Sequence, residues 1–224
     1  MEKNKNYLEL KKFSLEMGAA LFGVADISSC KDQFLLPPEI TAGMDKAICL
    51  GVRLSKSVMD DVKAQPTLLY FRNYRSANNL LDQLGLQVSN RLEEAGYLSL
   101  AIPASQVVDW KKQIGHISHK KIGYLAGLGW LGRNNLLVNS QLGSRFRLVT
   151  ILTNMPLTLD QPVNQDCGEC RQCIARCPAQ AIKESQKDFD YLKCLEQCKD
   201  FHRQRLAEQF ICGVCVSACA GRGK

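Results

Sequence analysis

The spacing of apolar residues along the first two thirds of the chain predicts helices and strands in a mixed order. Residues 5–17 carry apolar side chains at helical spacing and predict a first helix. Its apolar face comprises Tyr7, Leu8, Leu10, Phe13 and Leu15. Two short apolar runs rich in β-formers, 20–27 and 47–54, predict two strands, and the prolines at Pro37 and Pro38 predict a loop between them.

The longest helical pattern runs over residues 75–95, and Gly96 gives it a common type of end. Residues 98–104 then predict a strand, which Pro103 keeps short or at the edge of a sheet. Together these patterns predict a mixed α/β domain over residues 1–160.

Three glycines, Gly127, Gly129 and Gly132, have the G-x-G-x-x-G spacing of a dinucleotide-binding turn. The patterns that flank them predict a helix over 118–127 and strands over 135–139 and 145–154, with a turn around Gly143. A dinucleotide site requires the opposite order, strand, turn and helix, and an acidic residue about 20 positions further on. No acid lies at 150–155, so the context argues against a nucleotide site.

The chain has 224 residues, of which 46% are hydrophobic, and its first residues mix both signs of charge with apolar positions. This is neither the apolar core of a signal peptide nor a membrane span, so we expect a cytoplasmic protein without a membrane partner. Nine of the eleven cysteines fall between Cys167 and Cys219, which predicts a separate small domain over residues 161–224.

The stretch CGECRQCIARCP gives the first part of a ferredoxin motif, in which Cys167, Cys170 and Cys173 bind one 4Fe-4S cluster and Cys177 binds another. CGVCVSAC supplies the second half of the motif, and by the pseudo-twofold relation its last cysteine, Cys219, returns to the first cluster. We therefore expect a small α+β ferredoxin-like domain with two 4Fe-4S clusters.

The second cluster then has Cys177, Cys212 and Cys215 and needs one more ligand. Cys194 and Cys198 are the candidates; we favour Cys194 as the ligand, with Cys198 left over. A zinc site or disulfides are the alternatives. Zinc favours isolated four-ligand knuckles, and a cytoplasmic compartment disfavours disulfides.

The formal net charge of +7 counts every cysteine as a neutral thiol. Two clusters of roughly −2 each would lower it to about +3, which weakens a case for nucleic acid based on charge alone.

The stretch AGLGWLGRNNLLVNSQLGSRFRLVTILTNMPL, running into CGECRQCIARCPAQAI, resembles the core of the epoxyqueuosine reductase family, cobalamin-dependent iron-sulfur reductases related to reductive dehalogenases. The resemblance extends more weakly over LFGVADI and AICLGV. It implies a corrinoid-binding type of α/β domain ahead of the ferredoxin-like domain, and it marks the chain as a short member without the usual C-terminal extension.

The resemblance also implies that the glycine turn packs beside a corrin. The residues that it would bring to cobalamin are Gly127, Gly129, Trp130, Gly132, Arg133 and Gly143. Glycines allow a large flat ligand to approach the backbone, and an arginine can meet its amides or phosphate. Without a ligand, the same glycines make a tight turn and Trp130 is a core aromatic residue.

An epoxide reductase needs an acid for the leaving oxygen, and the V-D-S-A-P-like segment that carries this acid in the family is missing here. Between Gly96 and Gly127 the only carboxylate is Asp109, which is our candidate proton donor, with His116 and His119 as alternatives. Otherwise Asp109 is an exposed loop residue and the two histidines belong to the solvated start of a helix.

We therefore predict a corrinoid-dependent reductase that passes electrons from two 4Fe-4S clusters to cobalamin and on to a substrate. The alternative is a ferredoxin-type electron-transfer or activator protein that serves a partner enzyme and has no substrate of its own. Expected partners are an electron donor such as a flavodoxin or ferredoxin and a small molecule or modified nucleoside. A tRNA substrate is doubtful, since the segment after Cys219 is only a short basic tail, AGRGK.

Overall fold

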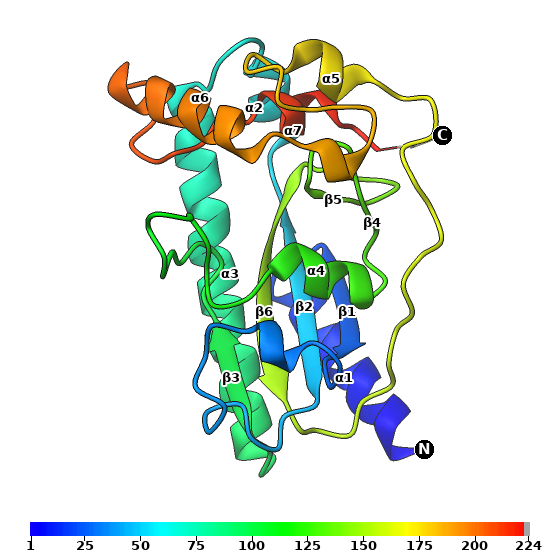
Figure 1. Cartoon of the computed structure of the whole chain (residues 1–224). Helices are drawn as coiled ribbons and strands as arrows, with labels where there is room; N and C mark the ends of the chain where they lie inside the picture. Colours follow the sequence, from blue (N-terminus) through cyan, green and yellow to red (C-terminus); the bar gives the residue numbers. More distant parts are fainter. Residues whose placement is uncertain (222–224) are drawn as a thin grey trace. The chain divides into compact units, whose positions relative to one another are not determined.

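The computed structural model describes residues 1–221, so the end of the expected tail domain and of its basic tail, 222–224, lies outside the described residues (Figure 1). The helices are α1 (Glu2–Glu16), α2 (Lys56–Asp61), α3 (Leu68–Glu94), α4 (His119–Leu125), α5 (Gln172–Arg176), α6 (Tyr191–Arg203) and α7 (Val214–Ala218), with short 3-10 helices at Lys31–Gln33 and Gln186–Asp188. The strands are β1 (Leu21–Asp26), β2 (Lys46–Arg53), β3 (Ser99–Ile102), β4 (Trp130–Leu131), β5 (Leu137–Val138) and β6 (Phe146–Thr153). The predicted mixed α/β class is confirmed.

The chain forms two compact units, each built from three separate segments. Unit 1 comprises Met1–Val52, Asn78–Leu128 and Arg147–Val163, and unit 2 comprises Arg53–Ala77, Gly129–Phe146 and Asn164–Lys224. The unit that contains the cysteine run is thus larger than the expected 161–224 segment, because two earlier stretches of the chain belong to it.

Unit 1 is built on a four-stranded sheet with the order β1-β2-β6-β3. β1 pairs antiparallel with β2, so that Leu21 lies opposite Gly51, and β3 pairs antiparallel with β6. β3 has four residues, lies at the edge of the sheet and ends just before Pro103. This is the short edge strand expected from the proline, which cannot donate a backbone hydrogen bond.

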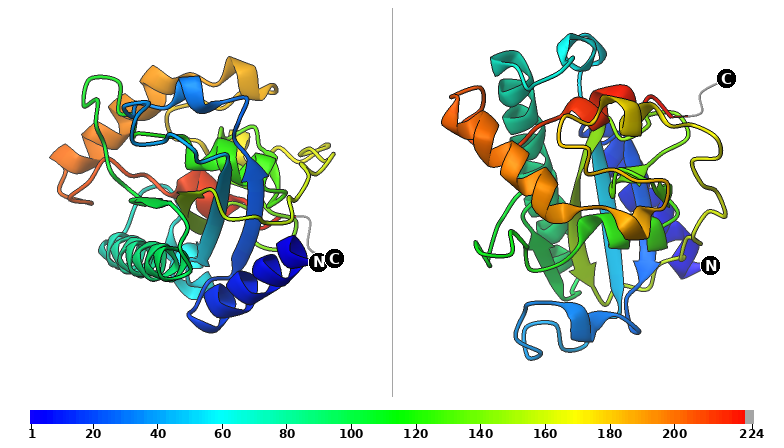
Figure 2. Two further views of the ribbon diagram at one scale, coloured as in Figure 1. Left: turned by 90° about the horizontal axis from the view of Figure 1, so that it is seen from below. Right: turned by 45° about the horizontal axis from the view of Figure 1, so that its top comes forward.

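Helices cover both faces of this sheet, as the view from below in Figure 2 shows. Neighbouring residues of a strand point to opposite faces. On β1 the ring of Phe22 meets Tyr7 of α1 at a centroid distance of 5.3 Å, whereas a methyl group added at Gly23 would lie 2.2 Å from the carbonyl oxygen of Ala126, just after α4. Helix α1 therefore covers one face, and α4 covers the other.

Helix α1 extends over the predicted range and buries Tyr7 and Leu10, but Leu8 and Leu15 of the expected apolar face are 53% and 42% exposed. The chain after β6 closes this edge of the sheet. The carboxylate of Asp160 accepts hydrogen bonds from the Tyr7 hydroxyl (3.1 Å) and from the backbone N–H of Val24 (2.8 Å).

Helix α3 begins at Leu68, seven residues before the predicted start at 75. The side chain of Thr67 accepts a hydrogen bond from the N–H of Tyr70 and caps the helix. Leu68 and Leu69 in its first turn are 64% and 58% exposed. Because these apolar residues do not face the core, they do not continue the apolar face from which the helix was predicted.

Unit 2 joins its segments through close contacts. A methyl group added at Gly213, between two cysteines of the tail, would lie 2.5 Å from the ring of Tyr70 in α3. Arg176 of α5 donates hydrogen bonds to the carbonyl oxygens of Val62 and Lys63, after α2. These contacts explain why residues 53–77 fold with the tail.

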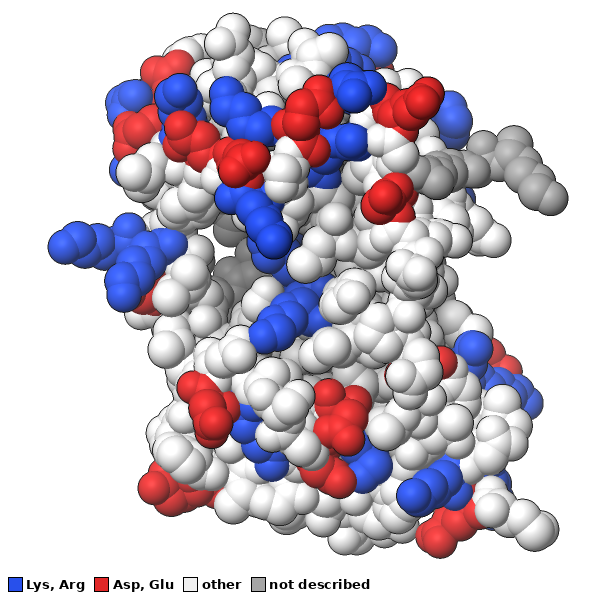
Figure 3. All heavy atoms as spheres, turned by 45° about the vertical axis from the view of Figure 1, so that its right-hand side comes forward, with Lys and Arg blue, Asp and Glu red and all other residues white. Residues whose placement is uncertain are grey.

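None of the helices between residues 1 and 221 combines the length and apolar character needed to cross a bilayer. On the face shown in Figure 3, basic side chains lie among acidic ones over much of the surface. A mixed pattern of this kind does not by itself favour nucleic acid as a partner.

Candidate functional site

Four cysteines of unit 2 form a first group. Burial raises the pKa of Cys173 to about 11, and the neighbouring sulfurs of Cys219, Cys167 and Cys170 add to that rise. Charge interactions of this kind fall off with distance, so each of these three sulfurs lies near that of Cys173. The end of α7 thus brings Cys219 to the loop that carries the first three cysteines of the motif.

A second group forms around α7 and α6. Burial raises the pKa of Cys212 to about 12, with a further rise from Cys194 and Cys177. Burial also raises the pKa of Cys215, and its neighbours Cys212, Cys194, Cys173 and Cys177 add to that rise. The structure therefore gathers Cys177, Cys194, Cys212 and Cys215, and the last of them adjoins the first group.

The ninth cysteine of the tail, Cys198, lies one helical turn after Cys194 on α6 and is buried. A hydrogen bond between the two sulfurs lowers the pKa of Cys194 and raises that of Cys198. This direction favours Cys194 as the thiolate of the pair. Cys198 also lies near Cys212 and Cys215, which contribute to the rise in its pKa.

All eleven cysteines lie among the described residues and are free thiols. Within residues 1–221, no three side chains of His, Cys, Asp or Glu converge as the ligands of a single metal ion do. The ligands of a 4Fe-4S cubane each bind a different iron atom, so they are spaced more widely. The thiol groups fit such a cluster, because bound iron would stabilise the thiolate forms that burial and neighbouring sulfurs disfavour in Cys173, Cys212 and Cys215.

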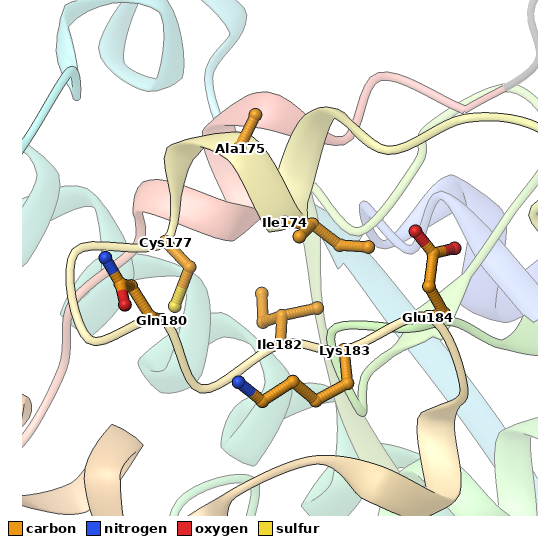
Figure 4. A pocket seen from close by; sticks show the side chains of 7 residues that line it. All are labelled: Ile174, Ala175, Cys177, Gln180, Ile182, Lys183 and Glu184. Carbon is orange, nitrogen blue, oxygen red and sulfur yellow. The ribbon is translucent and has the colours of Figure 1, made fainter.

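A pocket of about 470 Å³ lies beside Cys177 in unit 2 (Figure 4). Its lining residues are Ile174, Ala175, Cys177, Gln180, Ile182, Lys183 and Glu184. The sulfur of Cys177 points toward Ile182 in this view, and it accepts a hydrogen bond from the backbone N–H of Ala181 at 3.3 Å. One sulfur of the second group therefore faces a pocket.

The glycines expected beside a corrin approach the chain's own backbone. A methyl group added at Gly127 would lie 2.6 Å from the carbonyl oxygen of Gln161, and one at Gly129 would lie 2.0 Å from that of Val138. Gly143 has a φ of 61° and lies against Cys219, where an added methyl group would approach the carbonyl oxygen to 1.9 Å. Only glycine fits at these places, and protein atoms account for the requirement.

Trp130 and Arg133, the two other residues of the expected corrin site, contact the loop of the first cysteine group. The indole nitrogen of Trp130 donates a hydrogen bond to the sulfur of Cys167, at 3.5 Å. The guanidinium group of Arg133 donates to backbone carbonyl oxygens of the cysteine loop and its surroundings. Both side chains are thus engaged by the cysteine segment.

Asp109, the candidate proton donor, lies in unit 1 on the loop between β3 and α4. One carboxylate oxygen accepts hydrogen bonds from the backbone N–H groups of Lys111 (3.0 Å) and Lys112 (2.9 Å), which closes a turn. The backbone of Asp109 pairs with Ile114 across this turn. The next residue, Trp110, is 71% exposed, so the carboxylate lies on a surface loop.

The two histidines are held by other groups. Nδ1 of His116 lies 2.8 Å from the carbonyl oxygen of Leu35. His119 is half-buried: its Nε2 lies 3.1 Å from the carbonyl oxygen of Pro103, and its Nδ1 lies 2.9 Å from the Thr150 hydroxyl. Burial lowers the pKa of His119 to about 4, so at neutral pH the ring is neutral, with its proton on Nε2. His119 begins helix α4, as the helix start considered for it requires, and both of its ring nitrogens have protein partners.

The buried neutral His119 should make unit 1 sensitive to acid. Its pKa is about 4 in the folded chain, below the unfolded value of about 6.5, so its contribution is complete above pH 6.5 and is lost as the pH falls toward 4. Between about pH 7.5 and pH 5 the free energy of unfolding should fall by about 2 kcal/mol more than in His119→Gln, which cannot titrate. Anaerobic guanidinium unfolding measures this difference, and equal losses in both proteins would contradict it.

The fold of the chain is similar to that of two solved proteins. The structural match with the catabolic reductive dehalogenase NpRdhA, in complex with 3-bromo-4-hydroxybenzoic acid, covers 99% of this chain and 32% of that chain. Its TM-score is 0.73, and the sequences are 16% identical. The match with epoxyqueuosine reductase from Streptococcus thermophilus covers 97% of this chain and 66% of that chain, with a TM-score of 0.65 and 17% identity.

Part of the chain is similar in sequence to epoxyqueuosine reductases, as the resemblance predicted. The chain is 33% identical to the epoxyqueuosine reductase of Aliivibrio fischeri over 112 residues, which are 50% of this chain and 27% of that enzyme. These relatives are oxidoreductases. The matched part is about a quarter of the length of this relative. No family model matches the chain.

One further solved structure has a similar fold. An epoxyqueuosine reductase from Bacillus subtilis was solved with its catalytic aspartate loop swung out of the active site. It matches 78% of this chain and 52% of its own, with a TM-score of 0.51 and 17% identity.

Sequence reasoning missed several residues that shape the cysteine site. Tyr70, which packs on Gly213, gives no signal, because its partner is far along the chain. Trp130 and Arg133 were recognised, but not their contacts with the cysteine loop. Their position just ahead of the cysteine run is the signal that could have pointed there.

Proposed function

We propose that this chain is the core of an iron-sulfur reductase whose unit 2 binds two 4Fe-4S clusters. The first has Cys167, Cys170, Cys173 and Cys219 as ligands, and the second has Cys177, Cys194, Cys212 and Cys215. The observation that carries the proposal is that Cys219 lies near Cys173 of the first cysteine run, while Cys177 and the two α6 cysteines lie near Cys212 and Cys215.

The choice of Cys194 over Cys198 has its own support. Both lie on α6 near the second group, but the hydrogen bond between them favours the thiolate of Cys194 and the thiol of Cys198. A thiolate is the form that binds iron. Cys198 then donates a hydrogen bond to a ligand sulfur.

The similarity to epoxyqueuosine reductases further supports a corrinoid-dependent reaction. When bound, the clusters would supply single electrons, and a cobalamin would supply the reducing centre for the substrate. Cys170 is exposed, so the first cysteine group offers the access point for an electron donor such as a flavodoxin or ferredoxin. The substrate class is a small molecule or a modified nucleoside, in line with the epoxyqueuosine reductases that the chain resembles.

In this proposal Asp109 donates the proton to the leaving oxygen of the substrate. It lies on a surface loop, and the Bacillus subtilis enzyme also carries its catalytic aspartate on a loop, one that is swung out of the active site. His119 does not suit this role, because both ring nitrogens have protein partners and its pKa is about 4. An aspartic acid on a loop can move to a substrate and away from it.

The alternative from the sequence analysis is that the chain is a ferredoxin-type electron-transfer or activator protein that serves a partner enzyme. The exposed Cys170 suits this function equally, because electron exchange with another protein needs a cluster near the surface. Cobalamin binding distinguishes the two functions.

The test is to reconstitute the clusters anaerobically, add cobalamin and record its absorption spectrum. For the reductase we expect binding of about one cobalamin per chain at micromolar concentration, with a shifted cobalt spectrum. No binding at that concentration, with both clusters present, would reject the corrinoid reductase and leave the electron carrier. The Cys194→Ser variant serves as a control for effects of cluster loss.

A further inference from the structure

The glycine turn of unit 2, residues 129–133, contacts the first cysteine group directly. Trp130 is 2% exposed, and its indole nitrogen donates to the sulfur of Cys167 at 3.5 Å. The short strand β4 fixes the indole, because Trp130 pairs with Val138 of β5. Gly132 completes the approach: a methyl group added there would lie 3.5 Å from the same sulfur and 2.5 Å from a methyl group of Val138.

Arg133 holds the loop that carries the first two cysteines. Its Nη2 donates to the carbonyl oxygen of Gly168 (2.8 Å), its Nη1 to that of Cys170 (2.9 Å) and its Nε to that of Glu184 (2.8 Å). The side chain is 16% exposed. The rigid fork of a guanidinium group suits three fixed carbonyl acceptors, whereas a lysine could not bridge them.

From these contacts we propose that Trp130 and Arg133 are positioning residues of the first iron-sulfur cluster, and that Trp130 raises its reduction potential relative to a cluster without this hydrogen bond. The inference rests on the proposed clusters. It gives these two residues a role other than the corrin contacts that the family resemblance implies.

The direction of the effect follows from charge. Reduction adds an electron that is shared between iron and the ligand sulfurs, and an N–H donor to a ligand sulfur stabilises that added charge. The indole is buried, so water cannot replace its hydrogen bond without entering the site. Removing the N–H while keeping an aromatic side chain should therefore disfavour reduction of the first cluster.

The chain offers a matched pair of variants, because it has two tryptophans. Trp130→Phe removes the N–H beside Cys167, and Trp110→Phe makes the same change on an exposed loop of unit 1. Both are made in the full chain, reconstituted anaerobically, and titrated with a reductant while the EPR signals are recorded. The second cluster is an internal reference in every sample.

In Trp130→Phe we expect reduction of one cluster to become about five- to tenfold less favourable, which is a fall of about 40–60 mV in one of the two potentials. Trp110→Phe should leave both potentials at their wild-type values. Two unchanged potentials in a Trp130→Phe protein that holds both clusters would overturn the inference and leave the proposed function intact. A wild-type chain that assembles no clusters would reject the proposed function itself.

If Trp130→Phe fails to hold the clusters, the inference is tested in a chain that keeps Trp130. Pulsed EPR of Trp110→Phe, with ¹⁵N in the indole ring of its remaining tryptophan, should show a ¹⁵N coupling to one of the reduced clusters. The absence of that coupling, with both clusters reduced, would overturn the inference.

Discussion

Replacing Cys194 by serine should remove one of the two clusters from the reconstituted chain, whereas replacing Cys198 should leave both in place. Wild-type protein and Cys198→Ser should contain about eight iron atoms, and Cys194→Ser about four. The reason lies on α6, where Cys194 is the more acidic sulfur of a hydrogen-bonded pair close to Cys212 and Cys215. Anaerobic iron and sulfide analysis of the three proteins makes the comparison.

The pair is matched, since both variants change a cysteine to serine on the same helix. Cys198→Ser keeps a hydroxyl that can donate to Cys194, so we expect only a modest change in the potential of the second cluster. The reverse pattern, with iron lost from Cys198→Ser and retained in Cys194→Ser, would contradict the ligand assignment. It would make Cys198 the ligand and Cys194 its donor.

The second large effect concerns Asp109. If the chain reduces an epoxide, Asp109→Asn should lower kcat by about 10²- to 10⁴-fold, the usual contribution of a general acid. The asparagine oxygen can still accept the N–H groups of Lys111 and Lys112, so the turn of the loop should be preserved. Turnover of epoxyqueuosine, supplied as the free nucleoside and within a tRNA stem loop, is the measurement.

Two controls make the Asp109 result interpretable. Iron content and cobalamin binding should be unchanged in Asp109→Asn, since the residue lies in unit 1, outside the cysteine groups. His116→Gln alters the same loop region without removing a carboxylate and should retain turnover. Wild-type turnover in Asp109→Asn would show that Asp109 is not the proton donor and only stabilises the turn of its loop.

The cysteine groups were the most predictable part of the molecule. Ligand spacing in this motif is local, and the type of side chain is dictated by iron chemistry, so CGECRQCIARCP and CGVCVSAC indicate their partners from sequence alone. The structure places Cys219 near Cys173, and Cys177 near Cys212 and Cys215, whereas the ligand sets and the choice between Cys194 and Cys198 stay predictions. The edge strand before Pro103 was predictable for a similar reason, because proline restricts the backbone locally.

Long-range contacts were not predictable in this way. The approach of Tyr70 to Gly213 assigns residues 53–77 to unit 2, but nothing in either stretch of sequence points to the other. His119 has the sequence context of a solvated helix start, yet its ring nitrogens find Thr150 and Pro103 in the fold. Burial and pKa depend on such distant neighbours, whereas a motif depends on adjacent ones.

The glycine turn was predictable only in part. Its spacing and its tryptophan drew attention to a ligand, and the structure gives the turn a partner within the chain, the loop of Cys167. A turn of glycines indicates that something approaches the backbone closely, but the sequence does not say whether this is a cofactor or protein. Here the carbonyl oxygens of Val138 and Cys219 occupy the space that side chains at Gly129 and Gly143 would need.

The central claim is that unit 2 binds two 4Fe-4S clusters, and the most direct test is iron and acid-labile sulfide per chain after anaerobic reconstitution. We predict about eight of each, with an EPR signal of two interacting clusters after full reduction. About four of each, or one mole of zinc per chain in place of iron, would contradict the claim.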